Sequence, residues 1–261
     1  MLKIAKPVTP SQRQLIKLNS QLSKKKSLLK KEIKSLKKNS AGKNNSGRIT
    51  IKNRGGGHKK KYRKIQFSRF NTNTGIICSL EYDPYRKANI ASVFDLSLNN
   101  FFYILAPQEL QVGDIIKSGK NAKISIGHCL PLWKMPTGSF IHNVSFTKKK
   151  NSGQVSRSAG TYSQIIETMS GFVKIKISSG KQKFFSLNSY ATIGIISNEL
   201  VCLTQIGKAG RSRWLNKRPK VRGVAKNPVD HPHGGGEGKK SGKGLNYWGK
   251  PTKSGKTKKN K

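Results

Sequence analysis

The sequence predicts a mainly β protein: an OB-fold barrel followed by an SH3-like barrel, with long irregular basic extensions at both ends. Short alternating segments separated by turn signals recur between residues 48 and 200. Hydrophobic residues make up 34% of the 261 residues, too few for one large core but enough for two small barrels. The predicted division is therefore 1–47 (basic N-terminal extension), 48–118 (OB-fold, RNA-binding), 119–200 (SH3-like barrel) and 201–261 (extended basic C-terminal tail).

The N-terminal extension is rich in lysine. Leu15, Leu18, Leu22, Leu29 and Leu36 recur at helix-like intervals, but the run Lys24–Lys26 interrupts the pattern. We expect a basic arm that is partly helical when bound. The alternative is a targeting peptide, although transit peptides are typically rich in arginine rather than lysine.

The first barrel is predicted from four strand candidates and a short closing segment. Turn signals at residues 71–75, 83–84 and 99–100 separate the candidates. Within the second candidate, Ile76, Cys78, Leu80 and Tyr82 fall on one face, as expected for a half-buried strand whose apolar side faces the core. Short antiparallel strands at regular spacing favour an OB-type barrel. The candidates are Tyr62–Phe70, Ile76–Tyr82, Asn89–Phe94 and Phe101–Leu105, with Ile115 and Ile116 closing the set.

The second barrel is predicted from five more candidates. Phe172–Ile177 alternates cleanly, and Ser178–Gly180 supplies a hairpin turn. This pattern is typical of an SH3-sized meander barrel. The five candidates are Ser139–Ser145, Tyr162–Glu167, Phe172–Ile177, Gln182–Leu187 and Ala191–Ile196.

Charge indicates the partner. The chain has 53 Lys plus Arg against 10 Asp plus Glu, a formal net charge of +43. Such a chain repels itself strongly unless a polyanion neutralises it, and nucleic acid is the leading candidate. A membrane partner is not expected, because no run of 18 apolar residues or convincing amphipathic helix is evident. Three cysteines far apart predict neither a zinc ribbon nor a disulfide framework.

The stretch from Arg222 to Lys250 is the most distinctive. Its prolines and the glycines Gly234–Gly236 exclude a helix or central strand, and it has almost no apolar side chains. We expect it to take its shape only against a large negatively charged partner.

The histidines of this stretch leave alternatives open. His231 and His233 could ligate a metal, although cationic surroundings disfavour that reading. Asp230 could orient His231 as a general base, but no nucleophile or oxyanion donor is identifiable. We therefore expect no metal, no cofactor, no small-molecule substrate and no catalysis, with both imidazoles contacting RNA.

The predicted RNA-binding residues lie in the arm, in two basic loops and in the tail. Glycine-rich segments allow a phosphate backbone to approach, and Trp214 and Trp248 are candidates for stacking on exposed bases. The set comprises Asn44, Asn45, Arg48, Arg54, Gly55, Gly56, Gly57, His58, Lys59, Lys60, Lys61, Arg63, Arg86, Arg157, Ser158, Gly160, Lys208, Arg211, Arg213, Trp214, Arg218, Lys220, Arg222, Asn227, Asp230, His231, His233, Gly234, Gly235, Gly236, Lys239, Lys240, Trp248 and Lys250.

Arg218–Gly238, which reads RPKVRGVAKNPVDHPHGGGEG, resembles the signature of the universal large-subunit ribosomal protein L2 family almost without gaps. The resemblance extends over nearly the whole chain. Further matching segments are Lys43–Thr50, Arg54–Lys59, Glu81–Arg86, Tyr103–Pro107, Ile141–Val144, Ser158–Tyr162, Gly207–Gly210 and Trp248–Thr252.

The resemblance implies an OB-fold and an SH3-like barrel whose extensions thread into large-subunit rRNA near the subunit interface and the peptidyl-transferase centre. It implies a structural ribosomal constituent that contacts rRNA, other ribosomal proteins and the small subunit. Asp230 and His231 match a pair proposed as catalytic in that family, and that role is the alternative; a general cationic packer of DNA is a third.

The lysine bias, the early end of the tail and the organelle-like segment from Thr9 to Ser20 predict a mitochondrial ribosome. They also predict an organelle-encoded protein without a removable presequence. A plastid ribosome is the alternative location.

Overall fold

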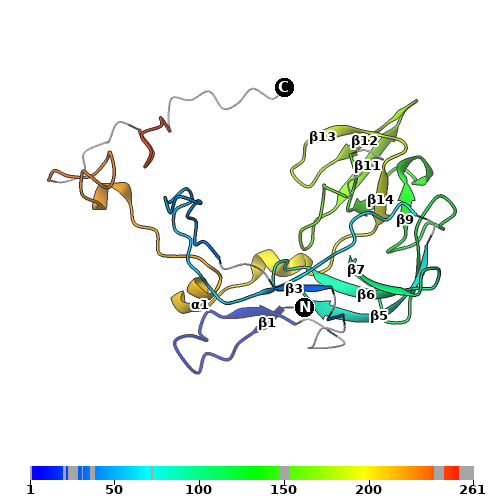
Figure 1. Cartoon of the computed structure of the whole chain (residues 1–261), viewed down its shortest axis with the longest axis horizontal. Helices are drawn as coiled ribbons and strands as arrows, with labels where there is room; N and C mark the ends of the chain where they lie inside the picture. Colours follow the sequence, from blue (N-terminus) through cyan, green and yellow to red (C-terminus); the bar gives the residue numbers. More distant parts are fainter. Residues whose placement is uncertain are drawn as a thin grey trace. The chain divides into compact units, whose positions relative to one another are not determined.

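The computed structural model describes residues 2–19, 22, 29–30, 32–35, 39–71, 73–146, 153–237 and 244–252 (Figure 1). Contacts divide the chain into two compact units, which are described separately. Unit 1 comprises residues 1–38 and 58–211, and unit 2 comprises residues 39–57 and 212–261. The predicted domain boundaries at residues 47, 118 and 200 were drawn from sequence composition and strand patterns, not from contacts, and they stay a prediction.

The first barrel of unit 1 is built on a four-stranded antiparallel sheet in the order β7-β6-β5-β8. Its inward residues, among them Ile77, Val93 and Ile116, form a compact apolar core. Burial alternates regularly along β5, but the expected core side was wrong: Gly75, Ile77, Ser79 and Glu81 are buried, whereas Ile76, Cys78 and Leu80 are only partly buried and Tyr82 is exposed. The strands are β5 (Thr74–Tyr82), β6 (Asn89–Asp95), β7 (Asn100–Leu105) and β8 (Ile115–Lys117).

The second barrel is a six-stranded antiparallel sheet in the order β13-β12-β11-β10-β14-β9. Leu130, Ile141, Ile165, Ile175 and Phe185 are among its fully buried core residues. The strands are β9 (Cys129–Pro131), β10 (Phe140–His142), β11 (Ser163–Thr168), β12 (Phe172–Lys176), β13 (Gln182–Ser186) and β14 (Tyr190–Ile193), with a 3-10 turn, η1 (Leu132–Lys134), after β9.

Together these sheets confirm the predicted fold class of an OB-type barrel followed by an SH3-like barrel. A third apolar cluster joins them within unit 1: Ile196 of the second barrel packs with Ile90 and Tyr103 of the first. Backbone hydrogen bonds reinforce the joint, with the Gln108 N–H donating to the Ile195 carbonyl at 2.7 Å.

The first strand candidate was wrong in its length. In the candidate Tyr62–Phe70, only β4 (Lys61–Arg63) includes strand residues, and β4 pairs with β3 (Ile33–Ser35). The rest is irregular because Ile65 forms an isolated bridge with Tyr103, and the buried Arg69 donates to the Gly127 carbonyl.

The described part of the N-terminal extension contains strands; an arm that is partly helical when bound stays a prediction, and residues 23–28 and Leu36 of the leucine pattern lie outside the described residues. β1 (Leu2–Ile4) and β2 (Ile16–Leu18) form an antiparallel hairpin. The buried Leu15 packs against Gly207, where an added Cβ would approach the Leu15 Cβ to 3.1 Å. Tertiary packing therefore overrides the helix-like leucine spacing here.

The remaining elements are short: η2 (Glu199–Leu203), α1 (Ala209–Trp214) and η3 (Gly223–Ala225). None of the described helices has the length and apolar character needed to cross a membrane.

Candidate nucleic-acid interface

None of the described residues in the predicted RNA-binding set is buried. Lys239 and Lys240 lie outside the described residues. The set divides between the units: His58, the lysines 59–61, Arg63, Arg86, Arg157, Ser158, Gly160, Lys208 and Arg211 belong to unit 1, and the others to unit 2.

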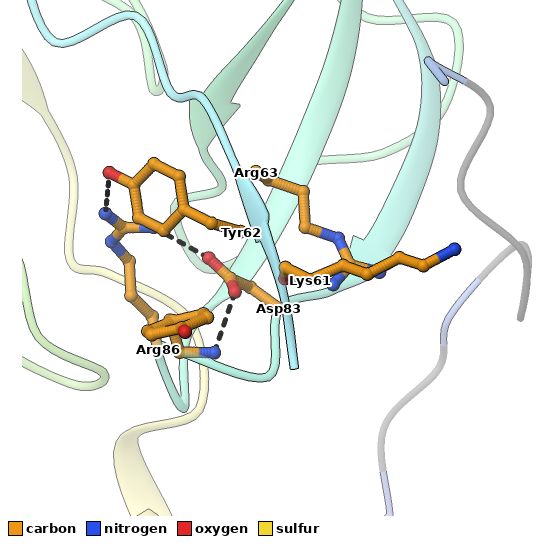
Figure 2. A network of polar contacts seen from close by, with 6 residues as sticks. Lys61, Tyr62, Arg63, Asp83 and Arg86 are labelled. Atoms are coloured by element: carbon orange, nitrogen blue, oxygen red, sulfur yellow. Dashed lines mark hydrogen bonds and ion pairs between the residues drawn. The ribbon is translucent and has the colours of Figure 1, made fainter. Parts of the chain in front are cut away.

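Successive side chains of strand β4 point to opposite sides of the strand. Figure 2 shows Tyr62 on one side of the strand and Lys61 and Arg63 on the other, as the pleat of a strand requires. Arg63 donates from Nη1 to the Lys61 carbonyl at 3.1 Å. Tyr62 is thereby presented to a neighbouring polar network.

That network centres on Asp83, whose side chain is fully buried. The Arg86 guanidinium donates to Asp83 Oδ2 at 2.7 Å and to the Tyr62 hydroxyl at 3.2 Å, as Figure 2 shows. The Tyr85 backbone N–H donates to Asp83 Oδ1 at 2.8 Å. A charge-assisted pair with a buried carboxylate fixes the plane of the guanidinium, and the guanidinium in turn fixes the tyrosine.

A pocket of about 570 Å³ opens beside this network. We call it the Tyr85 pocket; its walls are Tyr62, Phe67, Tyr85, Arg86, Lys87, Arg157, Ser158, Ala159 and Val201. The Arg157 guanidinium lies 4.8 Å from the centroid of the Phe67 ring, and that of Arg86 lies 5.4 Å from it. Phe67 therefore serves as a platform for two cations.

The loop that carries Arg157 and Ser158 is held on both sides. Ser156 has a left-handed backbone with φ of 52°, and its carbonyl accepts the Asn143 N–H at 3.0 Å. Gly160 has φ of 68°, and a Cβ there would stand 2.6 Å from the Glu199 Cα. Glycine is required at this close approach.

In unit 2, the basic loop 54–57 pairs with the start of the tail. The Gly55 N–H donates to the Asn216 carbonyl at 2.9 Å, and the Arg218 N–H donates to the Asn53 carbonyl at 3.0 Å. Arg54 and Lys217 form an antiparallel bridge. Backbone pairing thus places the cations of residues 54–57 beside those of residues 217–218, although the two segments are far apart in the sequence.

The glycines of the signature loop are positions of close approach. A Cβ on Gly223 would lie 2.5 Å from the ring of His231, and one on Gly234 would lie 2.4 Å from the Lys226 and Asn227 carbonyls. The Gly235 N–H donates to the Lys226 carbonyl at 3.3 Å. The loop closes on itself through its backbone, because glycine removes the side chains that would prevent it.

Both histidines accept backbone hydrogen bonds. His231 Nδ1 accepts the His233 N–H at 3.0 Å, and His233 Nε2 accepts the Leu245 N–H at 3.1 Å. Neutral His231 therefore carries its proton on Nε2 and neutral His233 on Nδ1. Loss of hydration, followed by the charges of His233, Lys52 and Lys226, lowers the pKa of His231.

The contacts of His231 differ from the carboxylate–imidazole pair that the sequence left open. Nδ1 of His231 is engaged by a backbone amide, and within the described residues Asp230 makes no hydrogen bond to the ring. The described residues also contain no group of three or more metal-ligating side chains.

Aromatic residues of unit 2 hold lysines. The Lys52 ammonium lies 2.8 Å from the centroid of the Tyr247 ring and 5.5 Å from that of Trp248, while Lys226 lies 5.4 Å from Tyr247. These cation–π contacts join residues 39–57 to the end of the described tail.

Sequence reasoning missed one residue of unit 1. Tyr85 was not among the predicted RNA-binding residues, yet it forms a wall of the pocket and contacts Tyr62 edge to face at 5.4 Å. A signal was present: an aromatic residue follows Asp83-Pro84 and precedes Arg86 and Lys87.

Exposed cations, aromatic platforms and glycine-lined backbone loops on small β-barrels define an RNA-binding β-barrel protein. Two family models extend this classification. "Ribosomal Proteins L2, RNA binding N-terminal domain" matches residues 30–118, and "Ribosomal Proteins L2, C-terminal domain" matches residues 125–249. The chain belongs to the ribosomal protein L2 family, a family of ribosomal proteins and not of enzymes.

Similar proteins support the same assignment. The chain is 50% identical to "Large ribosomal subunit protein uL2m" of Reclinomonas americana, over 97% of this chain and 92% of the relative. It is 49% identical to uL2 of Rickettsia felis over 100% and 95% of the two chains. Identity to uL2 of a Wolbachia strain from Drosophila simulans is 46%, over 99% and 94%.

Proposed function

We propose that the protein is a structural constituent of the large ribosomal subunit that binds large-subunit rRNA near the subunit interface and the peptidyl-transferase centre. In this role it supports subunit assembly, subunit association and translation. One observation carries the proposal: every described member of the predicted RNA-binding set is accessible, in both units. Ten carboxylates cannot neutralise 53 cations, so these exposed cations require an external polyanion.

The proposed partners are large-subunit rRNA, other ribosomal proteins and the small subunit across the interface. Phosphates would lie along the cations of loop 54–57 and the tail of unit 2, and against Lys61, Arg63 and Arg157 of unit 1. Backbone N–H groups of the glycine-rich loops would add phosphate contacts that need no side chain.

The proposed location is the mitochondrial ribosome, with a plastid ribosome as the alternative. The relative in Reclinomonas americana, named uL2m, supports the mitochondrial location, while bacterial relatives are about as similar. Isolating both organelles and immunoblotting each for the protein separates the two locations.

The proposed function predicts that the protein sediments with the large subunit after a high-salt wash, because many partly buried phosphate contacts survive screening. Sucrose gradients of organelle extracts measure this. In a separate binding assay with the purified chain, affinity should be higher for large-subunit rRNA than for duplex DNA of equal length at equal salt. Equal affinity would instead indicate a general cationic packer.

Deletion of Val229–Gly238 tests the role of the signature loop. The deletion should leave both barrels folded, since neither barrel core includes these residues. Large subunits carrying the deletion should assemble but translate poorly. Normal translation from such subunits contradicts the proposed role of the loop.

A further inference from the structure

We propose that the Tyr85 pocket receives one unstacked nucleobase of the large-subunit rRNA. The base lies against the Tyr85 ring, and its phosphate lies at Arg157 and Lys87. This inference rests on the proposed function and specifies how one part of unit 1 reads RNA. It makes Tyr85 a residue that binds a base, alongside cations that bind the backbone.

The size and walls of the pocket suit one nucleotide. A volume of about 570 Å³ lies within the range of pockets that enclose small molecules. Tyr62, Phe67 and Tyr85 supply three aromatic rings around that space. Because every base has a π-face, aromatic walls hold single-stranded bases effectively, and an unpaired base exposes the face that such walls contact.

The charges at the pocket select a ligand that carries phosphate. The buried carboxylate of Asp83 lies beside Arg86, and its two oxygens are already engaged by Arg86 and by the Tyr85 N–H. Arg157 lies over Phe67, and no hydrogen bond or ion pair is recorded for its guanidinium within the described residues. Its N–H donors are therefore available to phosphate oxygens.

The pocket is formed before any ligand binds. Arg86 is fixed by the buried Asp83, and Tyr62 is fixed by Arg86. The positive-φ residues Ser156 and Gly160 constrain the loop that carries Arg157. Only Tyr85, which is 46% exposed, and the ends of the long cationic side chains must be ordered on binding. The entropic cost of binding is therefore small.

A nucleobase fits this pocket better than an acidic peptide does. A carboxylate would satisfy the cations but would leave the exposed Tyr85 ring without a flat partner. A nucleotide supplies both a flat ring and an anion at the spacing of one residue. The base therefore accounts for the aromatic walls and the cations together.

Affinity measurements with the full-length chain and a large-subunit rRNA transcript test the inference. Tyr85→Ala should weaken binding about tenfold, the scale of one lost base stack, and Tyr85→Phe should stay within about twofold of the original chain. The matched control is Tyr82→Ala: Tyr82 is 57% exposed on the same barrel and does not line the pocket. It should also stay within about twofold.

The dependence on salt separates a base contact from a phosphate contact. Tyr85→Ala should lower affinity at every salt concentration with an unchanged log–log slope, because no phosphate contact is lost. Arg157→Gln should reduce the slope by about 0.7 to 0.9, the contribution of one phosphate. A Tyr85→Ala effect under twofold, or one that changes the slope as Arg157→Gln does, overturns the inference.

Ultraviolet crosslinking of the unmodified protein within intact large subunits, read by mass spectrometry, requires no variant to fold. We expect a nucleotide attached to Tyr85, Tyr62 or Phe67. Nucleotide crosslinks confined to other residues overturn the inference while leaving rRNA binding intact, and a ribosomal peptide attached at the pocket overturns it too. A protein that does not sediment with the large subunit instead overturns the proposed function.

Discussion

His231 shows how a single side chain can organise a loop without acting as a catalyst. Its Nδ1 accepts a backbone N–H, and its ring covers Gly223 so closely that no side chain fits there. Two neighbouring lysines and a second histidine disfavour a positive charge on the ring. The folded loop therefore favours the neutral form of the His231 imidazole over the protonated form.

This preference predicts that acid opens the loop. The pKa of His231 is lower in the folded loop than its ordinary value of 6.5, so its contribution to loop stability is complete above pH 6.5 and is lost as the pH falls below that value. Hydrogen exchange at the amides of His233 and Leu245 should accelerate in acid, relative to the Gly249 amide, which donates to a backbone carbonyl.

His231→Asn is the informative variant for that prediction, because its amide oxygen can accept the same hydrogen bond and does not titrate in this range. Its protection should vary less with pH. Equal pH dependence in both proteins would show that His231 does not control the loop.

At the same scale, the sequence predicted the residue types of the interface but not their partners. The proximity of Asp230 and His231 in the chain suggested a carboxylate–imidazole pair, yet a backbone amide holds the ring nitrogen. Tyr85 was missed because its role depends on Phe67 and Arg157, which are distant in the sequence and adjacent only in the folded unit. Chain spacing carries no information about such contacts.

At the scale of elements, turn signals located the strands, but alternation gave the wrong core side for β5. The predicted Ile76–Tyr82 and Asn89–Phe94 correspond to β5 and β6 within two residues at each end, because turn residues bound both segments; β6 is buried on both faces, so alternation does not define it. Tyr62–Phe70 was too long because its apolar residues serve two sites: Ile65 packs in the joint between the barrels and Phe67 faces the pocket. β9 is only three residues long, too short for alternation to reveal it.

The loop from Ser156 to Thr161 is the element that positions Arg157, and Gly160 fixes it. Gly160→Ala should destabilise unit 1 by about 1 to 3 kcal/mol more than Gly171→Ala does, because both substitutions force a left-handed residue and only the first places a Cβ against backbone. Chemical denaturation measures the difference. Gly160→Ala should also weaken rRNA binding; equal destabilisation by the two substitutions would show that the close approach to Glu199 is not limiting.

At the scale of the whole molecule, exposed cations and buried cations have different partners. The exposed cations are accessible to a polyanion. Among the described residues of unit 1, Arg69 is a buried cation at the joint between the barrels. Arg69 donates from Nη1 to the Gly127 carbonyl at 3.0 Å, and its Nε and Nη2 have no partner within the described residues. Burial lowers the pKa of this guanidinium, and a second buried cation beside it would be costly.

His142 is the group that acid would convert into that second cation. Burial, with Arg69 as a smaller contributor, lowers its pKa to about 4, although its Nδ1 donates to the Gly194 carbonyl at 2.8 Å. The unfolded chain takes up a proton near pH 6.5 and the folded unit only near pH 4. Stability present above pH 6.5 should therefore fall by ~3 kcal/mol as the pH drops through that window.

Urea denaturation of the full chain between pH 7.5 and pH 4, at fixed high salt to screen surface charges, measures this loss. His142→Gln keeps an amide donor near the Gly194 carbonyl but cannot take up a proton, so its stability should vary less across the window, even though it starts lower. A smaller pH dependence in His142→Gln would identify the joint between the barrels as the acid-sensitive part of unit 1, because salt screens surface charges but not a buried imidazole. If the two proteins lose stability in parallel, the loss arises from carboxylates elsewhere and the neutral imidazole does not maintain the joint.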